Sequence, residues 1–134
     1  MHAAISTVAF RGIDTIPVEV QVHIANGLPA MAIVGLADKA VAESRERVRA
    51  AVGSIELALP PKRIAVNLAP ADVVKEGAHF DLPIALGLLV AMGAIGPDAV
   101  TNRLVLGELS LHGGIELVSG VLPAAMAAVA VGQD

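Results

Sequence analysis

The sequence has no cysteine, no tryptophan and no tyrosine, and it lacks a long apolar run. The absence of cysteine excludes disulfides, thiol nucleophiles and zinc–thiolate sites. Although 55% of the residues are hydrophobic, the two longest uncharged runs, 82–97 and 117–132, contain glycine and proline. Both are shorter than the roughly 18–20 residues of a bilayer-spanning helix. The chain does not open with a cationic segment followed by an apolar one, so no signal peptide is expected. These absences predict a cytoplasmic protein with no membrane partner.

Positive charge is scarce overall but concentrated in one part of the chain. The formal net charge of −4 argues against a dedicated nucleic-acid-binding domain, yet six of the nine basic residues fall between 39 and 63, beside three acidic ones. This concentration indicates either a local basic surface or a solvated helix face. Residues four apart share a helix face and residues two apart do not. The candidates for contact with DNA are therefore Arg45 and Arg49, with Lys62 and Arg63 if the fold brings them near.

The hydrophobic pattern predicts one α/β domain over residues 1–134, with a mixed sheet and packed helices. β-Branched runs separated by a turn-like segment indicate a hairpin, and helical spacing alternates with further short apolar runs. The expected strands are 4–10, 16–24, 31–35 and 64–68, the expected helices are 38–52 and 82–94, and a second strand pair is expected over 103–111 and 115–119. A last helical pattern starts near Gly120 and runs to the end, which is typical of a domain from a longer protein.

The segment 38–52 has the pattern of an amphipathic helix. One side is lined by three valines and a serine, and charged residues lie elsewhere; the lining residues are Val41, Ser44, Val48 and Val52. Glu43 and Arg47 stand four residues apart, a spacing at which opposite charges pair on a helix surface.

Common motifs for ATP, metal and hydrolase sites are absent. The three lysines follow Asp38, Pro61 and Val74, so no Gly-Lys pair of a phosphate-binding P-loop exists. The four histidines are scattered and form no HExxH motif. His79 and Asp81 are close enough in sequence to share a metal. They also suit a Ser-His-Asp triad with Ser110 or Ser119, although no GxSxG motif supports one.

The segment "KEGAHFDLP", residues 75–83, has the composition of a structural turn before a helix. We expect Lys75 and Glu76 to be exposed, and Gly77 to take a backbone conformation that other residues disfavour. Asp81 is expected to cap the helix that begins at Leu82, with Pro83 in its first turn. Phe80 is expected to anchor the turn in the core.

Three stretches, "GLPAMAIVGLADKAVAESRERVRAA", "PPKRIAVNLAPADVVKEGAHFDLPIALG" and "LVLGELSLHGGIELVSGVLPAA", resemble a known family. They are similar, in the same order, to the N-terminal domain of the YifB/ComM family of magnesium-chelatase-like AAA+ ATPases. The resemblance implies a Lon-protease-like fold of the ribosomal protein S5 domain 2 type. It also implies an AAA+ module C-terminal to this domain that binds ATP and Mg, a homo-oligomer (a hexameric ring at full length), and a DNA motor in recombination of transforming DNA.

The resemblance to Lon-type domains also implies where a catalytic pair would lie. Active members use a serine nucleophile with a lysine base, since a neutral amine can take the hydroxyl proton. The serine position corresponds to His79 and the lysine position to Leu122, so both catalytic side chains are missing. The expected role is a non-catalytic accessory domain that aids ring assembly, guides DNA, or both. One alternative is an unconventional peptidase that uses His79 or a serine elsewhere. Another is a role in the insertion of a metal into a tetrapyrrole.

Overall fold

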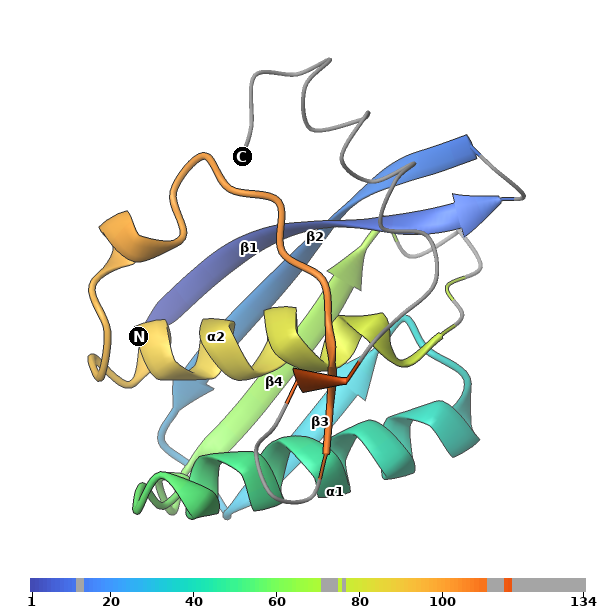
Figure 1. Cartoon of the computed structure of the whole chain (residues 1–134). Helices are drawn as coiled ribbons and strands as arrows, with labels where there is room; N and C mark the ends of the chain where they lie inside the picture. The colour runs from blue at the N-terminus through green and yellow to red at the C-terminus, as the bar shows by residue number, and fades with distance from the viewer. Residues whose placement is uncertain (12–13, 71–74, 76, 111–114, 117–134) are drawn as a thin grey trace.

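The computed structural model describes residues 1–11, 14–70, 75, 77–110 and 115–116. A four-stranded mixed sheet forms the centre of the domain. Its strands lie in the order β1 (His2–Arg11), β2 (Asp14–Ala25), β4 (Arg63–Ala69) and β3 (Ala30–Val34). Figure 1 shows both long helices packed against the same face of this sheet. The predicted α/β class, the single domain and the mixed sheet with packed helices are confirmed. No helix in the described part of the chain is long and apolar enough to cross a membrane.

The predicted hairpin is confirmed and supplies two strands of the sheet. β1 (His2–Arg11) pairs antiparallel with β2 (Asp14–Ala25), and Ile5 lies opposite Val20. Along β2, the residues at even positions from Val18 to Ile24 are buried and the intervening residues are exposed. The period of two therefore turns the apolar side chains toward the helices and leaves the polar ones on the open face.

A parallel crossover builds the other half of the sheet. β3 (Ala30–Val34) leads into α1 (Asp38–Ser54), which returns the chain to β4 (Arg63–Ala69), parallel to β3. β4 also pairs antiparallel with β2, so it is a central strand, as its apolar sequence predicts. Gly35, between β3 and α1, has φ +109 and lies against Leu68 of β4. The chain can turn this closely onto the sheet because this residue has no side chain.

Helix α1 covers the sheet with the predicted apolar stripe. Ser44, Val48 and Val52 are buried, and Val41 is half-buried. Arg47 and Glu43 lie 4.0 Å apart, N to O, so the predicted pair is confirmed. Since the Glu43 side chain is 53% exposed, this pair contributes little to stability.

Helix α2 (Asp81–Ala91) crosses β1 and β2 and forms most of the remaining core. A short 3-10 turn, η1 (Ala78–Phe80), precedes it, and Phe80 is 1% exposed, which confirms the predicted anchor. The helix begins at Asp81 and ends at Ala91, rather than at the predicted Leu82 and Ala94. Pro83 is buried in the first turn, as predicted.

The segment after α2 runs back across that helix. It forms hydrogen bonds both with β1 and with η1, the turn that precedes α2. η2 (Pro97–Ala99) is followed by a short contact with β1, in which the Val105 N–H donates to the Ser6 carbonyl at 2.9 Å. β5 (Glu108–Leu109) then pairs with β6 (Ile115–Glu116). The predicted strand pair is thus confirmed only in part, because 103–107 form no strand. The helix expected from Gly120 lies outside the described residues.

Candidate functional site

The turn before α2 is hydrogen-bonded to Gly107 at two points, His79 and Leu82. The Leu82 N–H donates to the Gly107 carbonyl, and the Gly107 N–H donates to the His79 carbonyl, each at 2.9 Å. Gly77 has φ +99, which confirms its predicted role. A Cβ at Gly77 would lie 2.9 Å from His79 Nδ1, so the glycine also makes room for the imidazole. The turn is therefore held rigidly at the start of α2.

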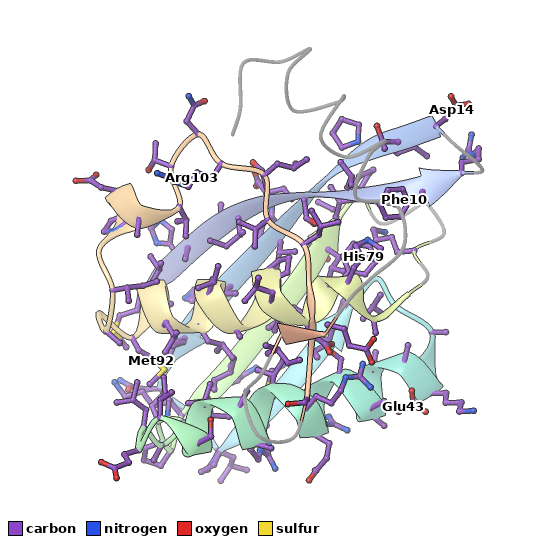
Figure 2. All side chains as sticks on the ribbon, viewed as in Figure 1. Phe10, Asp14, Glu43, His79, Met92 and Arg103 are labelled. Atoms are coloured by element: carbon purple, nitrogen blue, oxygen red, sulfur yellow. The ribbon has the colours of Figure 1, made fainter. Side chains whose placement is uncertain are left out.

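His79 is a buried structural partner of β1. Its Nε2 lies 2.7 Å from the Val8 carbonyl oxygen, and its side chain is 4% exposed. Ser6 and Val8 are two residues apart, so their carbonyls point to the same side of β1, the edge away from β2. Val105 satisfies the first of these carbonyls, and the imidazole N–H satisfies the second. The ring also contacts the chain's two phenylalanines. Its centroid lies 4.9 Å from that of Phe10, whose side chain is labelled beside His79 in Figure 2, and 4.1 Å from that of Phe80.

Burial of the imidazole lowers the pKa of His79 below its ordinary value of 6.5. The hydrogen bond to the Val8 carbonyl and the nearby Asp81 charge act in the opposite direction, but burial has the larger effect. A charged imidazolium is disfavoured there because the protein interior solvates it poorly. His79 is therefore neutral in the folded protein near neutral pH, with its proton on Nε2 to match the carbonyl.

We expect stability to fall in acid through His79. Because the pKa of His79 is lower in the folded state, the unfolded state binds the proton more readily. The contribution of neutral His79 to stability is therefore fully present above the unfolded pKa and is lost as pH drops below about 6.5. The loss can reach about 1.4 kcal/mol per pH unit. Urea unfolding between about pH 5 and 8 should give a shallower dependence for His79→Gln than for the parent. The exposed His23 provides the control: His23→Gln should keep the parent's steeper dependence, and equal slopes in all three proteins would refute the assignment.

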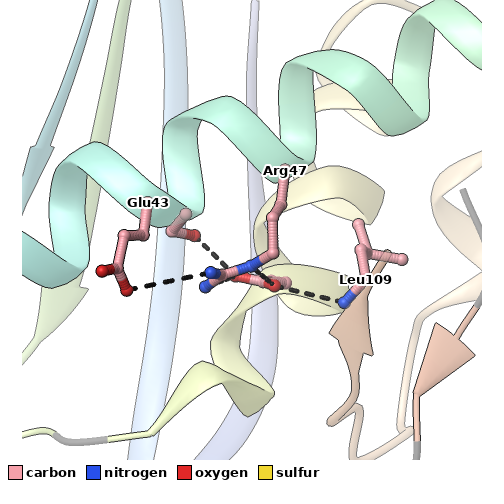
Figure 3. Close-up of polar contacts among 5 residues, drawn as sticks. Glu43, Arg47 and Leu109 are labelled. Atoms are coloured by element: carbon pink, nitrogen blue, oxygen red, sulfur yellow. Dashed lines mark hydrogen bonds and ion pairs between the residues drawn. The ribbon is translucent and has the colours of Figure 1, made fainter. Parts of the chain in front are cut away.

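Asp81 lies at the centre of a buried polar network that joins three elements (Figure 3). Its carboxylate is 1% exposed and accepts hydrogen bonds from Ser44 Oγ at 2.7 Å and Arg47 Nε at 2.6 Å. Arg47 Nη2 donates to Asp81 Oδ1 at 3.2 Å, and the Leu109 N–H donates to Asp81 Oδ2 at 3.1 Å. The side-chain hydrogen bond to Asp81 raises the pKa of Arg47 further above its ordinary value. The bidentate, charge-assisted contact with Arg47 joins α2 to α1, and the Leu109 hydrogen bond joins α2 to β5.

Two predictions for this turn are wrong. Asp81 makes no capping hydrogen bond to α2, which begins at Asp81 itself, because its carboxylate turns toward α1 and β5. Lys75, predicted to be an exposed loop charge, is only 3% exposed. For Asp81 the cause is packing between distant elements, which places the donors of α1 and β5 against its carboxylate. Glu76, for which exposure is also predicted, lies outside the described residues.

A small hollow of about 190 Å³ opens beside this network, between α1 and the turn. Its lining includes Ser44, Arg47, Gly77 and Asp81. Ser44 directs its hydroxyl proton at Asp81, whose charge Arg47 already balances, so the carboxylate is a weak base for that proton. The sequence pattern does not mark Ser44 or Arg47 as members of a site. A serine on the valine stripe of α1 is the available signal, because a buried hydroxyl needs a partner.

The other arrangements considered from the sequence are not assembled here. His79 bonds to Val8 and Asp81 bonds to Ser44 and Arg47, so the two side chains do not form the His-Asp part of a triad. The described residues contain no group of three or more side chains placed to hold a metal. Ser119 and Leu122 lie outside the described residues, so the position expected for a catalytic lysine is untested.

The four basic candidates are only partly brought together. Arg49 and Lys62 line one hollow, whereas Arg63 is exposed on the first position of β4 and does not line it. Arg45 is half-buried, and its Nη1 donates to the Met31 carbonyl of β3 at 2.9 Å. Arg47 faces Asp81 instead, so it lies apart from Arg49 as helical geometry predicts. The fold therefore places Arg49 and Lys62 around one hollow, turns Arg63 to the open face of the sheet, and commits Arg45 to the sheet edge.

Comparison with known proteins gives consistent matches over nearly the whole chain. A family model for subunit ChlI of Mg-chelatase matches residues 20–134. The chain is 39% identical over 132 residues to the uncharacterized protein YifB of Salmonella typhimurium, covering 98% of this chain and 26% of that protein. It is 43% identical over 120 residues to the competence protein ComM of Haemophilus influenzae, covering 90% of this chain and 24% of that protein. The uncharacterized protein Rv2897c of Mycobacterium tuberculosis is 43% identical over 122 residues, 91% of this chain and 24% of that protein. The chain thus spans about a quarter of the length of the curated relatives it matches.

Proposed function

Because the chain belongs to the Mg-chelatase ChlI family, we propose that it is a non-catalytic accessory domain of a magnesium-chelatase-like AAA+ ATPase that acts on DNA. The likeness to ComM, a competence protein, supports a role in recombination of incoming DNA. In this proposal, ATP and Mg bind a separate AAA+ module, and the full-length protein assembles into a hexameric ring. The accessory domain aids that assembly.

The proposed fold type is that of the Lon proteolytic domain and ribosomal protein S5 domain 2. Two features are compatible with it: a four-stranded mixed sheet, and two helices packed on one face of that sheet. In this alignment, the turn at Gly77 corresponds to the turn that carries the nucleophile in active Lon-type domains. The geometry of a peptidase turn is then retained for structural reasons.

The burial and contacts of His79 are the observation that supports the non-catalytic assignment. This residue occupies the position expected for the serine nucleophile, yet it is buried, donates to the Val8 carbonyl and packs between two phenylalanines. An imidazole held this way cannot approach a substrate carbonyl without leaving β1. A general base or nucleophile must be within hydrogen-bond reach of the group on which it acts.

An unconventional peptidase is the competing enzyme hypothesis, and Ser44 is its best candidate nucleophile. The hydroxyl borders the 190 Å³ hollow beside the turn. A serine needs a strong neighbouring base to become nucleophilic. The Ser44 hydroxyl contacts Asp81, whose negative charge is balanced by Arg47. Because Ser44 has this weak base as its neighbour, the accessory role is favoured. Metal insertion, suggested by the family's name, has no supporting cluster among the described residues.

We expect neither peptide nor casein hydrolysis from this domain. The measurement is release of fluorescence from labelled casein and from a mixed peptide library, with His79→Ala and Ser44→Ala as companions. The parent and both variants should match the buffer blank. Turnover by the parent that disappears in either variant would overturn the non-catalytic assignment.

Full-length protein with an intact ATPase module should instead show ATP hydrolysis stimulated by DNA. The absence of this stimulated hydrolysis would refute the DNA motor.

Direct contact of this domain with DNA is a second candidate role. The observation in its favour is that Arg49 and Lys62 line one hollow at one end of the domain. Contacts of this kind are sequence-independent and weaken steeply with salt, because binding releases counterions from the phosphates. Arg45, the other candidate, is engaged with the Met31 carbonyl, which weakens its part in this role.

A further inference from the structure

A hollow of about 590 Å³ lies where the C-terminal end of α1 meets the beginnings of β3 and β4. Its floor and walls are apolar, and they include Met31, Leu57, Leu59 and Ile64 together with Pro29, Pro60 and Pro61. Of these, Met31 and Ile64 belong to the core, and the leucines are half-buried against it. The hollow is thus an open extension of the hydrophobic core, a setting suited to aliphatic side chains.

Two exposed apolar side chains are close in sequence to residues that line this hollow. Leu28 is 87% exposed and precedes Pro29 in the lining, and Ile55 is 56% exposed and lies two residues before Leu57. Only two other large apolar side chains among the described residues are exposed, Met1 and Val34. Apolar side chains gathered around a concave surface mark a place where another molecule binds.

The charge at the rim is positive although the chain as a whole is negative. Arg49 and Lys62 contribute to the lining, and the described lining contains no acidic residue. The acidic residues near it in sequence are Glu56, next to Leu57, and Glu46, one helical turn before Arg49. Among the described residues, ion pairs involve Arg47 and not Arg49 or Lys62. The rim therefore complements a partner that carries carboxylates.

From this combination we infer that the hollow is a docking site for a protein segment with aliphatic and acidic side chains. Aliphatic groups would fill the hollow while Asp or Glu side chains meet Arg49 and Lys62 at the rim, the usual division into an apolar centre and a polar border. Nucleic acid fits less well, because its contacts are mostly phosphate and sugar and would leave the leucine and proline walls unmatched. Docking of this kind does not depend on the proposed DNA motor.

The neighbouring edge of the sheet indicates how the segment docks. β3 is an edge strand that pairs with β4. The Ala30 N–H faces Lys62 on the β4 side, so the Met31 carbonyl points to the free edge, where Arg45 donates to it. An added strand would have to displace this side chain. Docking therefore proceeds through side chains in the hollow rather than by extension of the sheet.

The test uses the full-length protein and synthetic fluorescein-labelled peptides of equal length. One peptide alternates Leu and Glu, a second replaces each Glu with Lys, and a third replaces each Leu with Ser. A labelled single-stranded DNA and a labelled DNA duplex provide the nucleic-acid arm. Fluorescence anisotropy should show binding of the Leu/Glu peptide at least about tenfold tighter than that of either control peptide.

Two pairs of substitutions on exposed positions separate the apolar and charged contributions. Arg49→Glu with Lys62→Glu should weaken binding of the Leu/Glu peptide by about tenfold, through loss of rim charge. Leu28→Ser with Ile55→Ser should weaken it by about fivefold, through loss of apolar contact. The matched controls lie away from the hollow: Arg11→Glu for charge and Val34→Ser, at 57% exposure, for apolar surface. Neither control should change the affinity by more than about twofold.

Two outcomes would overturn the inference. One is binding of the Leu/Glu peptide no tighter than that of the Lys or Ser peptides, or unchanged by both rim pairs while thermal melts show folded proteins. The other is DNA binding that is lost in the charge-reversed pair and kept in the Leu28 and Ile55 pair, with no peptide binding. That second result would assign the rim to nucleic acid. Loss of peptide affinity in both rim pairs, with the controls unaffected, would establish the docking site.

Discussion

Replacing Asp81 with alanine is expected to lower the free energy of unfolding by about 3–5 kcal/mol, the usual cost of breaking a buried ion pair from one side. The change leaves the Arg47 guanidinium, which is 20% exposed, without its charge partner. It also leaves the Ser44 hydroxyl and the Leu109 N–H without an acceptor. Each such orphaned group costs about 1–3 kcal/mol. Since small domains are stable by only about 5–15 kcal/mol, we expect a severely weakened protein.

The asparagine variant distinguishes this network from a helix cap. A cap needs a single acceptor, so asparagine would restore most of its stabilisation. Here the carboxylate meets three donor groups, and an amide NH₂ in place of one oxygen would face a donor rather than accept from it. Asp81→Asn should therefore remain closer to Asp81→Ala than to the parent.

Urea unfolding of both variants is the measurement, with Asp98→Ala as the control. Asp98 is an exposed aspartate near the start of η2, and its removal should change stability by no more than about 0.5 kcal/mol. A double-mutant cycle with Arg47→Ala should give a coupling of about 1–3 kcal/mol. A loss below about 2 kcal/mol for alanine, with recovery by asparagine, would show instead that Asp81 acts as a cap.

Gly35→Ala is expected to cost about 3 kcal/mol, although it adds only one methyl group. The residue has φ +109, a conformation that side-chain-bearing residues rarely adopt. An added Cβ would lie 2.8 Å from the Leu68 carbonyl oxygen and 3.0 Å from the Leu68 Cβ. Leu68 is fully buried on the central strand β4, so neither atom can withdraw without disturbing the sheet. Strain and overpacking therefore act together.

Gly53→Ala provides the matched control for this effect. Gly53 lies in the last turn of α1, and a Cβ added there would meet no other atom within 4 Å. Alanine at this position should stabilise the protein by about 0.5–1 kcal/mol, because glycine is the poorer helix former. Thermal or urea unfolding measures both changes. Equal stabilities for the parent and Gly35→Ala would mean that the turn between β3 and α1 relaxes freely.

The sequence alone determined the features that depend on neighbours along the chain. Alternation from Val18 to Ile24 identified the half-buried strand β2, and the spacing of Ser44, Val48 and Val52 identified the buried side of α1. Gly77 was identified as a residue in an unusual backbone conformation. The three family-like stretches were sufficient for membership in the family. The direction of side chains repeats every two residues in a strand and about every 3.6 in a helix. The buried side of each element can therefore be inferred from the sequence without knowing the fold.

Only the tertiary structure decided what the buried polar side chains bind. The partners of Asp81 lie 28, 34 and 37 residues away in the sequence, and no pattern near Asp81 specifies them. The capping prediction failed because a carboxylate at the start of a helix can turn to the first-turn amides or to another element, and packing makes that choice. The fold likewise buries Lys75 and places Lys62 and Arg49 around one hollow. A buried polar group must be satisfied by whatever the fold places against it, so its role is fixed by the assembled layers rather than by its own segment.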